Sequence, residues 1–497
     1  MAARRPSTLR RLLVAATAVA SSLALPAGAS ASVRVTSDPG LRPGFDRGIA
    51  DYVVRCPRDG SIVLSLHASD GEKVGVGHRA PRGGDFTETV SRRPGGGITI
   101  HVESSTRPGD YHVRCLPRDF RRFDVSRPGT PQARGYVVTP NGRSQHGYVA
   151  ILDSHATPIW WHHSSDYGPW DAKILPGGHI AWTHYKGGPF GELKAYGYEE
   201  RRLDGHRVRR IRTRGTPTDT HDLQRLPNGH YLALTYTHRD GVDLRKWGGD
   251  RRSRVYEGQI QELTPGGRLV WRWSSHGHIK TSETLWWDVL NGAQRNKPAD
   301  ERHWDLVHVN AVQPDGDALI ASFRHVNAIY KIDRASGRIV WKLGGTKRPE
   351  SLRVVGDPYG QRPFGGQHDV RLSDDGTLTV FDNETGRDRP PRAVRYRIDE
   401  AARTATLVEQ IDAPVPLESQ FGGSARKLPG GDWVIYWGGD LLFTEQQADS
   451  GAEVLRVTRH GSHWGYRVVP LPESVSLQSI RRGMDRMVAG TRAASWR

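Results

Sequence analysis

The chain has 497 residues, among them 57 glycines and 31 prolines, and its formal net charge at pH 7 is +17. This length allows two or three domains with a large core, and the many turn residues without long helical periodicity favour an all-β protein. The positive charge is spread along the chain without a helix-turn-helix, zinc-finger or RNP-like string, so the composition argues against a nucleic-acid partner.

Residues 1–31 predict a secretory signal peptide. A basic segment, MAARRPSTLRR, precedes the apolar LLVAATAVASSLAL, and Ala29-Ser30-Ala31 supplies small residues for cleavage. The apolar run is too short and too rich in alanine to predict a stable membrane span. We therefore expect an exported, extracellular protein whose mature chain begins near Ser32.

Residues 33–128 predict a small N-terminal β-sandwich. The segments SIVLSLHAS and GGITIHVES alternate apolar and polar residues, as half-buried strands do. The two cysteines of the sequence, Cys56 and Cys115, end the matching strings DYVVRC and DYHVRC. Matching strands in an exported chain predict one disulfide between them. For this domain we expect a structural cap or an assembly surface.

Residues 133–470 contain a repeated strand-turn-strand unit. Six turn glycines, each after Pro, Asn, Asp or Gly, mark it: Gly142, Gly178, Gly229, Gly316, Gly376 and Gly431. Eight residues before them, where the preceding strand should start, stand Arg134, Trp170, His221, His308, His368 and Gly423. Six units of this size predict a six-bladed β-propeller.

Three consecutive units carry a histidine at the same repeat position. Equivalent positions of a propeller lie at one radius around its channel, so we expect His221, His308 and His368 to form one cluster. The alternative for any single histidine is a satisfied polar residue at a blade edge. Strand alternation places Asn310 on the face of His308, and it places the aspartates after His221 and His368 on the opposite face.

Two further segments lie outside the repeat. The insertion 274–304 contains Trp286 and Trp287, which can stack on an aryl ring or pack the loop onto its own blade. The C-terminal tail, residues 471–497, has weak helical periodicity, and we expect it to pack outside the last blade.

The strings HDLQRLPNG, HVNAVQPDGDALIASFRH, GRIVWKLGG, GGQHDVRLSDDGTLTVFDN and GGSARKLPGGDWVIYWG resemble those of the bacterial aryl sulfotransferase (arylsulfate sulfotransferase) family. These enzymes are PAPS-independent six-bladed propellers that transfer a sulfuryl group from an aryl sulfate to a phenol. The resemblance covers roughly residues 133–470. It implies that His368 is the nucleophile, with His221, His308, Asn310 and Arg324 around it.

The chemistry of these side chains fits that implied role. Neutral imidazole is a good nucleophile, and attack by His368 would give a covalent sulfohistidine. Arg324 and Asn310 would hold the sulfuryl oxygens, while His308 or His221 would handle the phenol proton. Tyrosines 185, 236 and 359 could line an aryl pocket, but the motifs do not match them to the family.

Cofactors are not expected. The sequence lacks a G-x-x-x-x-G-K-[ST] loop for a nucleotide sulfate donor, and it lacks the H-E-x-x-H and C-x-x-C pairs of zinc sites. We predict no cofactor, no metal, and an aryl sulfate donor and a phenolic acceptor as small-molecule partners. Three convergent histidines leave a metal site open as an alternative. The other alternative is a non-catalytic secreted propeller for binding or assembly. The oligomeric state is not predicted.

Overall fold

The computed structural model describes residues 33–494 except 141–146, 165–167, 186–196, 415–416, 439–441 and 460–464. The predicted signal peptide and the turn at Gly142 lie outside these residues. Strands dominate the described part of the chain, whose two α-helices are α1 (Trp287–Gln294) and α2 (Leu477–Ala494). The predicted all-β class is thus confirmed. No helix of the described part is long and apolar enough to cross a membrane.

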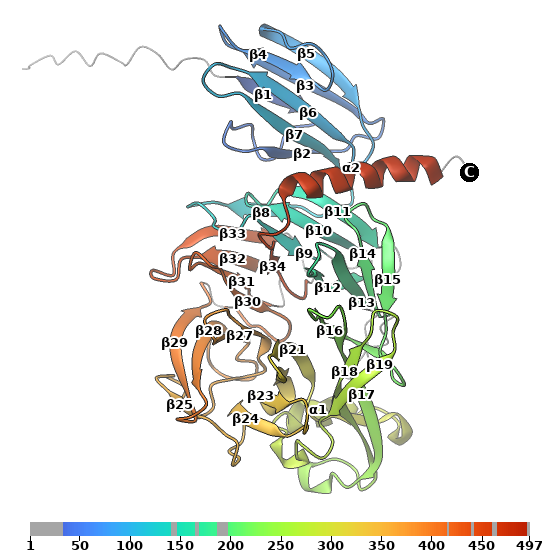
Figure 1. Ribbon diagram of the computed structural model, residues 1–497, viewed down its shortest axis with the longest axis vertical. Coiled ribbons are helices and arrows are strands. Elements are labelled where there is room, and N and C mark those ends of the chain that lie inside the picture. The colour runs from blue at the N-terminus through green and yellow to red at the C-terminus, as the bar shows by residue number, and fades with distance from the viewer. Residues whose placement is uncertain are drawn as a thin grey trace, which may run out of the picture.

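Two sheets form the N-terminal part (Figure 1). One contains β1 (Arg34–Asp38), β3 (Ser61–Ala68) and β5 (Gly84–Ser91); the other contains β2 (Asp51–Arg55), β7 (Gly109–Leu116), β6 (Gly97–Glu103) and β4 (Lys73–Val76). Alternate residues of β3 and β6 are buried in one shared core, as the sequence pattern predicts. Cys56 and Cys115 are joined by a disulfide, which confirms the predicted pairing.

Six further sheets follow around the body of the molecule (Figure 1). The first holds β9 (Gly135–Val138), β10 (Gly147–Asp153), β11 (Pro158–Ser164) and β34 (Val469–Pro470); the second holds β12 (Gly168–Ile174), β13 (Ile180–Tyr185), β14 (Tyr198–Arg201) and β15 (Arg207–Ile211). The third holds β16 (Thr218–Arg225), β17 (Tyr231–Val242), β18 (Ser253–Leu263) and β19 (Leu269–Ser274), with β20 (His303–Asp305) beside β18. The fourth holds β21 (Val309–Asp315), β22 (Ala318–Phe323), β23 (Ala328–Asp333) and β24 (Ile339–Gly344). The fifth holds β26 (His368–Leu372), β27 (Thr377–Asp382), β28 (Arg392–Asp399), β29 (Thr404–Asp412) and β25 (Arg353–Val355). The sixth holds β30 (Ser424–Lys427), β31 (Trp433–Tyr436), β32 (Leu442–Gln446), β33 (Glu453–Arg459) and β8 (Phe123–Ser126).

Strands from the two ends of this region meet in one sheet. The first strands β12, β16, β21, β26 and β30 pack against one another in this order, and β34 lies beside β30. β34 also pairs with β9, so the last strand belongs to the first sheet. The prediction that Arg134 starts a first strand equivalent to the others is therefore wrong. β9 is the second strand of its sheet, and the C-terminal strand β34 takes the first place.

Tryptophans from one sheet hold the next sheet in place. Trp160 of β11 donates to the carbonyl of Leu203 at 2.7 Å, in the turn between β14 and β15. Trp273 of β19 donates to the carbonyl of Gly337 at 2.9 Å, and Trp341 of β24 donates to Glu400 at 3.0 Å. In each case the tryptophan lies on an edge strand of one sheet. Its acceptor lies in the turn before the last strand, in chain order, of the next sheet. They give a structural reason for the repeated PIWW, RLVWRW and RIVW strings.

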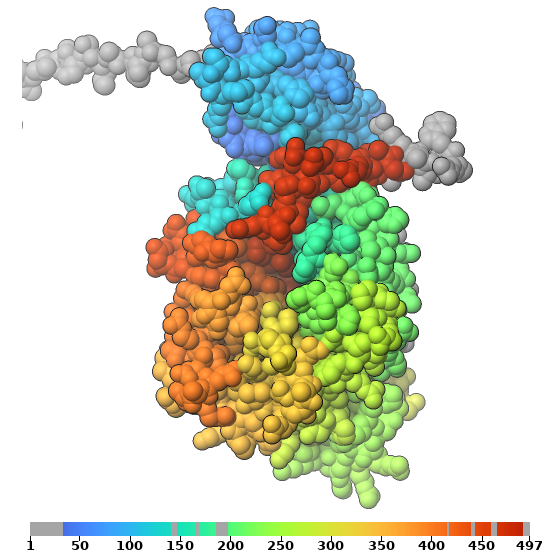
Figure 2. Space-filling model, viewed as in Figure 1, coloured from blue at the N-terminus to red at the C-terminus, as the bar shows by residue number. Residues whose placement is uncertain are grey.

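Helix α2 lies between the N-terminal sheets and the first of the six (Figures 1 and 2). Ile480 and Met484 are buried in the core that includes β10 and β11. Arg481 bonds Asp51 of β2 at 2.5 Å, and Asp485 accepts a 2.8 Å bond from Arg114 of β7. The expectation that the tail packs outside the last sheet is therefore wrong. The helix is amphipathic, so its apolar face packs on the first sheet while its charged residues pair with the N-terminal sheets.

Candidate active site

The histidines occupy irregular points of their strands. Pairing is shifted between Thr218 and Leu223, between Val309 and Ala311, and between His368 and Arg371. His308 also has a left-handed backbone, with φ +51°. Such bulges re-aim side chains at the edge of a sheet. Because β21 begins only after His308, strand alternation does not relate His308 to Asn310, and that part of the prediction is wrong.

The structure brings the three predicted histidines into one cluster. The ring centres of His221 and His308 are 4.7 Å apart. Tyr466 connects them to the third, with ring centres 5.6 Å from His221 and 6.2 Å from His368. Tyr466 precedes the C-terminal strand β34, which takes the first place in the first sheet. It therefore stands where the repeat spacing placed Arg134. His325 stacks on His308 at 4.7 Å and extends the cluster.

Asn310 and Arg324 also lie at this cluster. The amide nitrogen of Asn310 donates to the carbonyl of Gln367 at 2.8 Å, directly before His368. Its amide oxygen is buried without a hydrogen-bond partner among the described residues. The guanidinium of Arg324 donates to the carbonyl of Gln420 at 2.6 Å and lies 4.1 Å from the ring centre of Trp286.

Each histidine has its own Nδ1 partner, and none of these partners is apparent from the motifs. Nδ1 of His221 lies 2.7 Å from the carboxylate of Asp219, and Nδ1 of His308 lies 2.6 Å from that of Asp305. Nδ1 of His368 instead lies 2.7 Å from the amide oxygen of Asn383. A histidine nitrogen that faces a carboxylate or an amide oxygen carries the proton, so all three rings keep Nε2 as the free base.

The orientation of Asn383 is set by its other contacts. Its amide nitrogen donates to the Ser419 hydroxyl at 2.8 Å and to the Gly422 carbonyl at 3.0 Å. Its oxygen must therefore face His368. The backbone N–H of Gly422 points at Nε2 of His368 at 3.3 Å, which agrees with an unprotonated Nε2.

Burial keeps the rings of His308 and His368 neutral. Desolvation, followed by the nearby charge of Arg324, lowers the pKa of His368 well below its ordinary value. Desolvation, followed by His221 and Arg324, does the same to the pKa of His308. Burial lowers the pKa of Arg324 to about 10, so this side chain stays charged at neutral pH. The site thus combines neutral imidazoles with one fixed cation.

A buried ion network lies beneath the histidines. Arg467 reaches Asp171 at 2.8 Å, Asp222 at 3.3 Å and Asp369 at 3.2 Å. Further cations complete the network, namely Lys173, Arg371 and Arg426. Burial alone would raise the pKa of Asp222, but the charges of Arg371, Lys173 and Arg467 lower it far below its ordinary value. Asp222 and Asp369 thus connect neighbouring sheets through these cations. They do not orient His221 and His368, which agrees with their predicted place on the opposite face.

A cavity of about 570 Å³ opens beside Arg324 and Asn383. Its other walls include Trp286, Leu417 and Phe421. Of the two insertion tryptophans, Trp286 thus lies at the site, whereas Trp287 stacks on Trp247 with ring centres 5.3 Å apart.

The three tyrosines have different places. Tyr236 lies 6.3 Å from His308 between ring centres. Tyr359 packs under the guanidinium of Arg389 at 3.6 Å. The side chain of Tyr185 lies outside the described part of the structure.

One group in the described residues has the spacing of metal ligands: Asp305, His308 and His325, whose ligand atoms lie within 4.8 Å of one another. The carboxylate of Asp305 already accepts from His308, through the backbone N–H at 3.0 Å and through Nδ1 at 2.6 Å. His325 Nδ1 is bonded to the carbonyl of Asp305 at 2.7 Å. These hydrogen bonds indicate that Asp305 orients His308, and they favour this role over that of a metal ligand.

Known proteins provide an independent comparison. Similar solved structures include a protein of unknown function from Bacteroides caccae, with 12% identity, a TM-score of 0.41 and coverage of 69% of this chain and 100% of that one. A putative 6-phosphogluconolactonase from Bacteroides fragilis has 12% identity, a TM-score of 0.33 and coverage of 80% and 98%. These scores are too low to support an argument on function. A search of curated proteins gives no match. The sequence model described as Arylsulfotransferase (ASST) matches residues 128–467, which is most of the chain, and the chain therefore belongs to the arylsulfotransferase family.

Proposed function

We propose that the protein is a PAPS-independent aryl sulfotransferase that transfers a sulfuryl group from an aryl sulfate ester to a phenol through a sulfohistidine at His368. Membership of the family supports aryl sulfotransferase activity in general. The observation that carries the finer proposal is the neutral partner of His368, Asn383. We also infer that the six sheets are the blades of a propeller whose axis passes near Tyr466 and Arg467.

Asn383 suits His368 to nucleophilic attack. The amide accepts the Nδ1 proton without adding negative charge, so it directs the Nε2 lone pair without stabilising the imidazolium. Attack by Nε2 on sulfur forms an N–S bond and breaks the S–O bond to the aryl group, whose electron pair leaves with the phenolate. In the second half-reaction the acceptor oxygen attacks the same sulfur, the N–S bond breaks, and neutral His368 returns.

His221 and His308 suit the proton transfers. Each is paired with a carboxylate, at 2.7 and 2.6 Å, which stabilises the ring once its Nε2 has taken up a proton, and the departing phenolate takes that proton. The same pair recovers that proton from the acceptor hydroxyl in the second half-reaction. Because the pKa of His308 is lowered by burial, its Nε2 is ready to act as the base toward the acceptor.

Fixed donors near His368 suit the sulfuryl oxygens. Arg324 brings a planar cation that remains charged in the buried site. The backbone N–H of Gly422 lies next to the attacking nitrogen, and its 3.3 Å bond to Nε2 is long enough to be exchanged for a sulfuryl oxygen. The open amide oxygen of Asn310 offers an acceptor for a phenol hydroxyl.

We propose that the aryl groups enter by the cavity beside Arg324. Trp286, Leu417 and Phe421 give it an apolar wall, and its volume of about 570 Å³ suits a substituted ring. The disulfide between Cys56 and Cys115 supports the further proposal that the protein works after export, since such bonds persist in oxidising compartments.

The direct test is transfer without a nucleotide. Purified protein is incubated with 4-nitrophenyl sulfate and a naphthol, and nitrophenol release and naphthyl sulfate are measured together. The proposal requires both products in equal amounts, and it requires neither from the His368→Asn variant. Donor binding without any sulfated naphthol would identify a non-catalytic binding protein and would overturn the proposal.

A further inference from the structure

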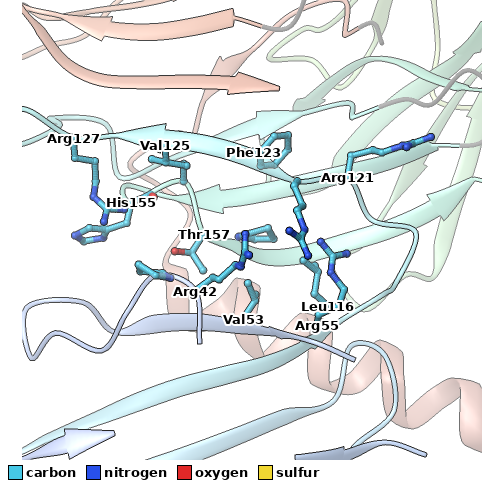
Figure 3. Close-up of a pocket in the computed structure, with 14 residues that line it drawn as sticks. Arg42, Val53, Arg55, Leu116, Arg121, Phe123, Val125, Arg127, His155 and Thr157 are labelled. Carbon is cyan, nitrogen blue, oxygen red and sulfur yellow. Dashed lines mark hydrogen bonds between the residues drawn. The ribbon is translucent and has the colours of Figure 1, made fainter. Parts of the chain in front are cut away.

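A second cavity, which none of His221, His308 and His368 lines, lies at the seam between the N-terminal sheets and the six-sheet region (Figure 3). Its volume is about 210 Å³. One side is formed by β2, the end of β7 and the loop that contains Arg42. The other side is formed by β8 and by the turn between β10 and β11 that contains His155.

Arginine side chains dominate the polar part of the lining. Five reach the cavity, and no carboxylate lines it: Arg42, Arg55, Arg121, Arg122 and Arg127. A neighbouring cavity of about 430 Å³ shares Arg55, Arg121 and Arg122 and adds Arg118. Asp119, which lines this second cavity, bonds the hydroxyl of Tyr148 at 2.8 Å.

These arginines have no ionic partner among the described residues. Arg55 donates to the carbonyls of Pro117 and Phe120, both at 2.6 Å, and Arg127 donates to the carbonyl of His155 at 2.9 Å. Elsewhere at the same seam, arginines are neutralised by carboxylates, as Arg114 is by Asp485 and Arg481 by Asp51. Burial, followed by the charges of Arg122 and Arg42, lowers the pKa of Arg55, and the smaller opposite effect of Asp119 does not cancel it.

The rest of the lining is apolar. Val53 and Leu116 come from the N-terminal sheets, and Phe123, Val125 and Pro158 come from the opposite side. Val125 remains 37% exposed. An inorganic anion would use only the guanidinium groups, whereas a ligand with an apolar body would also cover these side chains.

From this combination we propose that the seam binds an amphiphilic organic anion, with an aromatic or branched apolar body and one sulfonate, sulfate, phosphate or carboxylate group. Guanidinium groups from both sides would hold the anionic group, and the valines, Leu116 and Phe123 would hold the body. The ligand would thereby link the N-terminal sheets to the six-sheet region. This binding site is independent of the proposed transfer reaction.

The test is calorimetric titration with 2-naphthalenesulfonate, whose carbon–sulfur bond prevents sulfuryl transfer. The double variant Arg42→Gln/Arg122→Gln removes two charges from side chains that make no hydrogen bond or ion pair among the described residues, so its melting temperature should stay close to that of the parent. Its dissociation constant at the seam should rise at least about 10-fold, or about 1.4 kcal/mol, since two guanidinium groups no longer bond the anion. The matched control, Arg251→Gln/Arg252→Gln, removes two exposed charges from the β17–β18 connection and should bind as the parent does.

Two further titrations separate the seam from other sites. Inorganic sulfate should bind at least about 10-fold more weakly than the naphthalenesulfonate, because it leaves the apolar wall uncovered. Arg324→Gln should leave the seam affinity unchanged. The proposal is overturned by equal affinity of the Arg42/Arg122 variant and the parent, by equally tight binding of sulfate, or by loss of all binding in Arg324→Gln.

Discussion

The amide oxygen of Asn383 lies 2.7 Å from Nδ1 of His368, the position that a carboxylate occupies at His221 and His308. This difference distinguishes three histidines that share one place in the repeat. A neutral partner orients the ring and leaves Nε2 as a base, whereas a carboxylate also favours the protonated ring. The proposal that His368 is the nucleophile and that the other two carry protons rests on this difference.

Asn383→Asp should change the pH dependence of the reaction as well as its rate. A carboxylate at Nδ1 would stabilise the imidazolium and raise the pKa of His368, which burial lowers in the parent. With 4-nitrophenyl sulfate, which needs no acid, the parent should keep its rate as the pH falls from 7.5 to about 6. The variant should lose about 10- to 100-fold at pH 6.5 and regain part of it at higher pH. An equal loss at every pH would indicate a merely structural role for Asn383.

His308→Asn and His221→Asn should slow poor donors more than good ones. Loss of a proton carrier costs typically about 10²–10⁴-fold, and a leaving group of low pKa relieves part of this cost. The ratio of rates for 4-nitrophenyl sulfate and phenyl sulfate should therefore rise in at least one variant. If both variants slow the two donors by the same factor, neither histidine carries the proton.

Arg324→Lys should lose about 10²-fold or more in kcat/KM. A lysine keeps the charge but cannot keep both the bond to the Gln420 carbonyl and a planar face for the sulfuryl oxygens. Arg387 lines the same cavity but pairs with Glu384 at 3.8 Å and not with the histidines. Arg387→Lys is therefore the matched control, and it should retain activity within a few-fold. Equal effects of the two substitutions would contradict the specific role of Arg324.

Arg467→Met should destabilise the six-sheet region. Arg467 is buried against Asp171, Asp222 and Asp369 and also donates to the carbonyls of His221 and Asn310, both at 2.8 Å. Removing one member of a buried ion network costs about 3–5 kcal/mol. The free energy of unfolding can be measured by urea titration, with the exposed Arg251→Gln as a control expected within about 0.5 kcal/mol of the parent. A loss below about 1 kcal/mol for Arg467→Met would show that the network does not need this cation.

Much of the site could be predicted from local spacing, because His221, His308 and His368 each stand eight residues before a turn glycine. The Nδ1 partners of these histidines could not be predicted from local spacing. Asn383 reaches His368 because β27 folds back on β26, and Asp305 arrives at the end of a long insertion. Tyr466 and Arg467 precede β34, which ends the region and has no turn glycine of its own, so the spacing pointed to Arg134 instead. Closure of the first sheet by the C-terminal strand is a tertiary contact that no local pattern records.

The proposed transient bond between sulfur and His368 can be measured directly. The protein is mixed with excess 4-nitrophenyl sulfate without an acceptor, quenched at alkaline pH, digested and examined by mass spectrometry. We expect one added sulfuryl group on the peptide that contains His368, its disappearance when a phenol is added, and its absence in His368→Asn. A sulfuryl group on another residue, or an adduct that still accumulates in His368→Asn, would show that His368 is not the nucleophile.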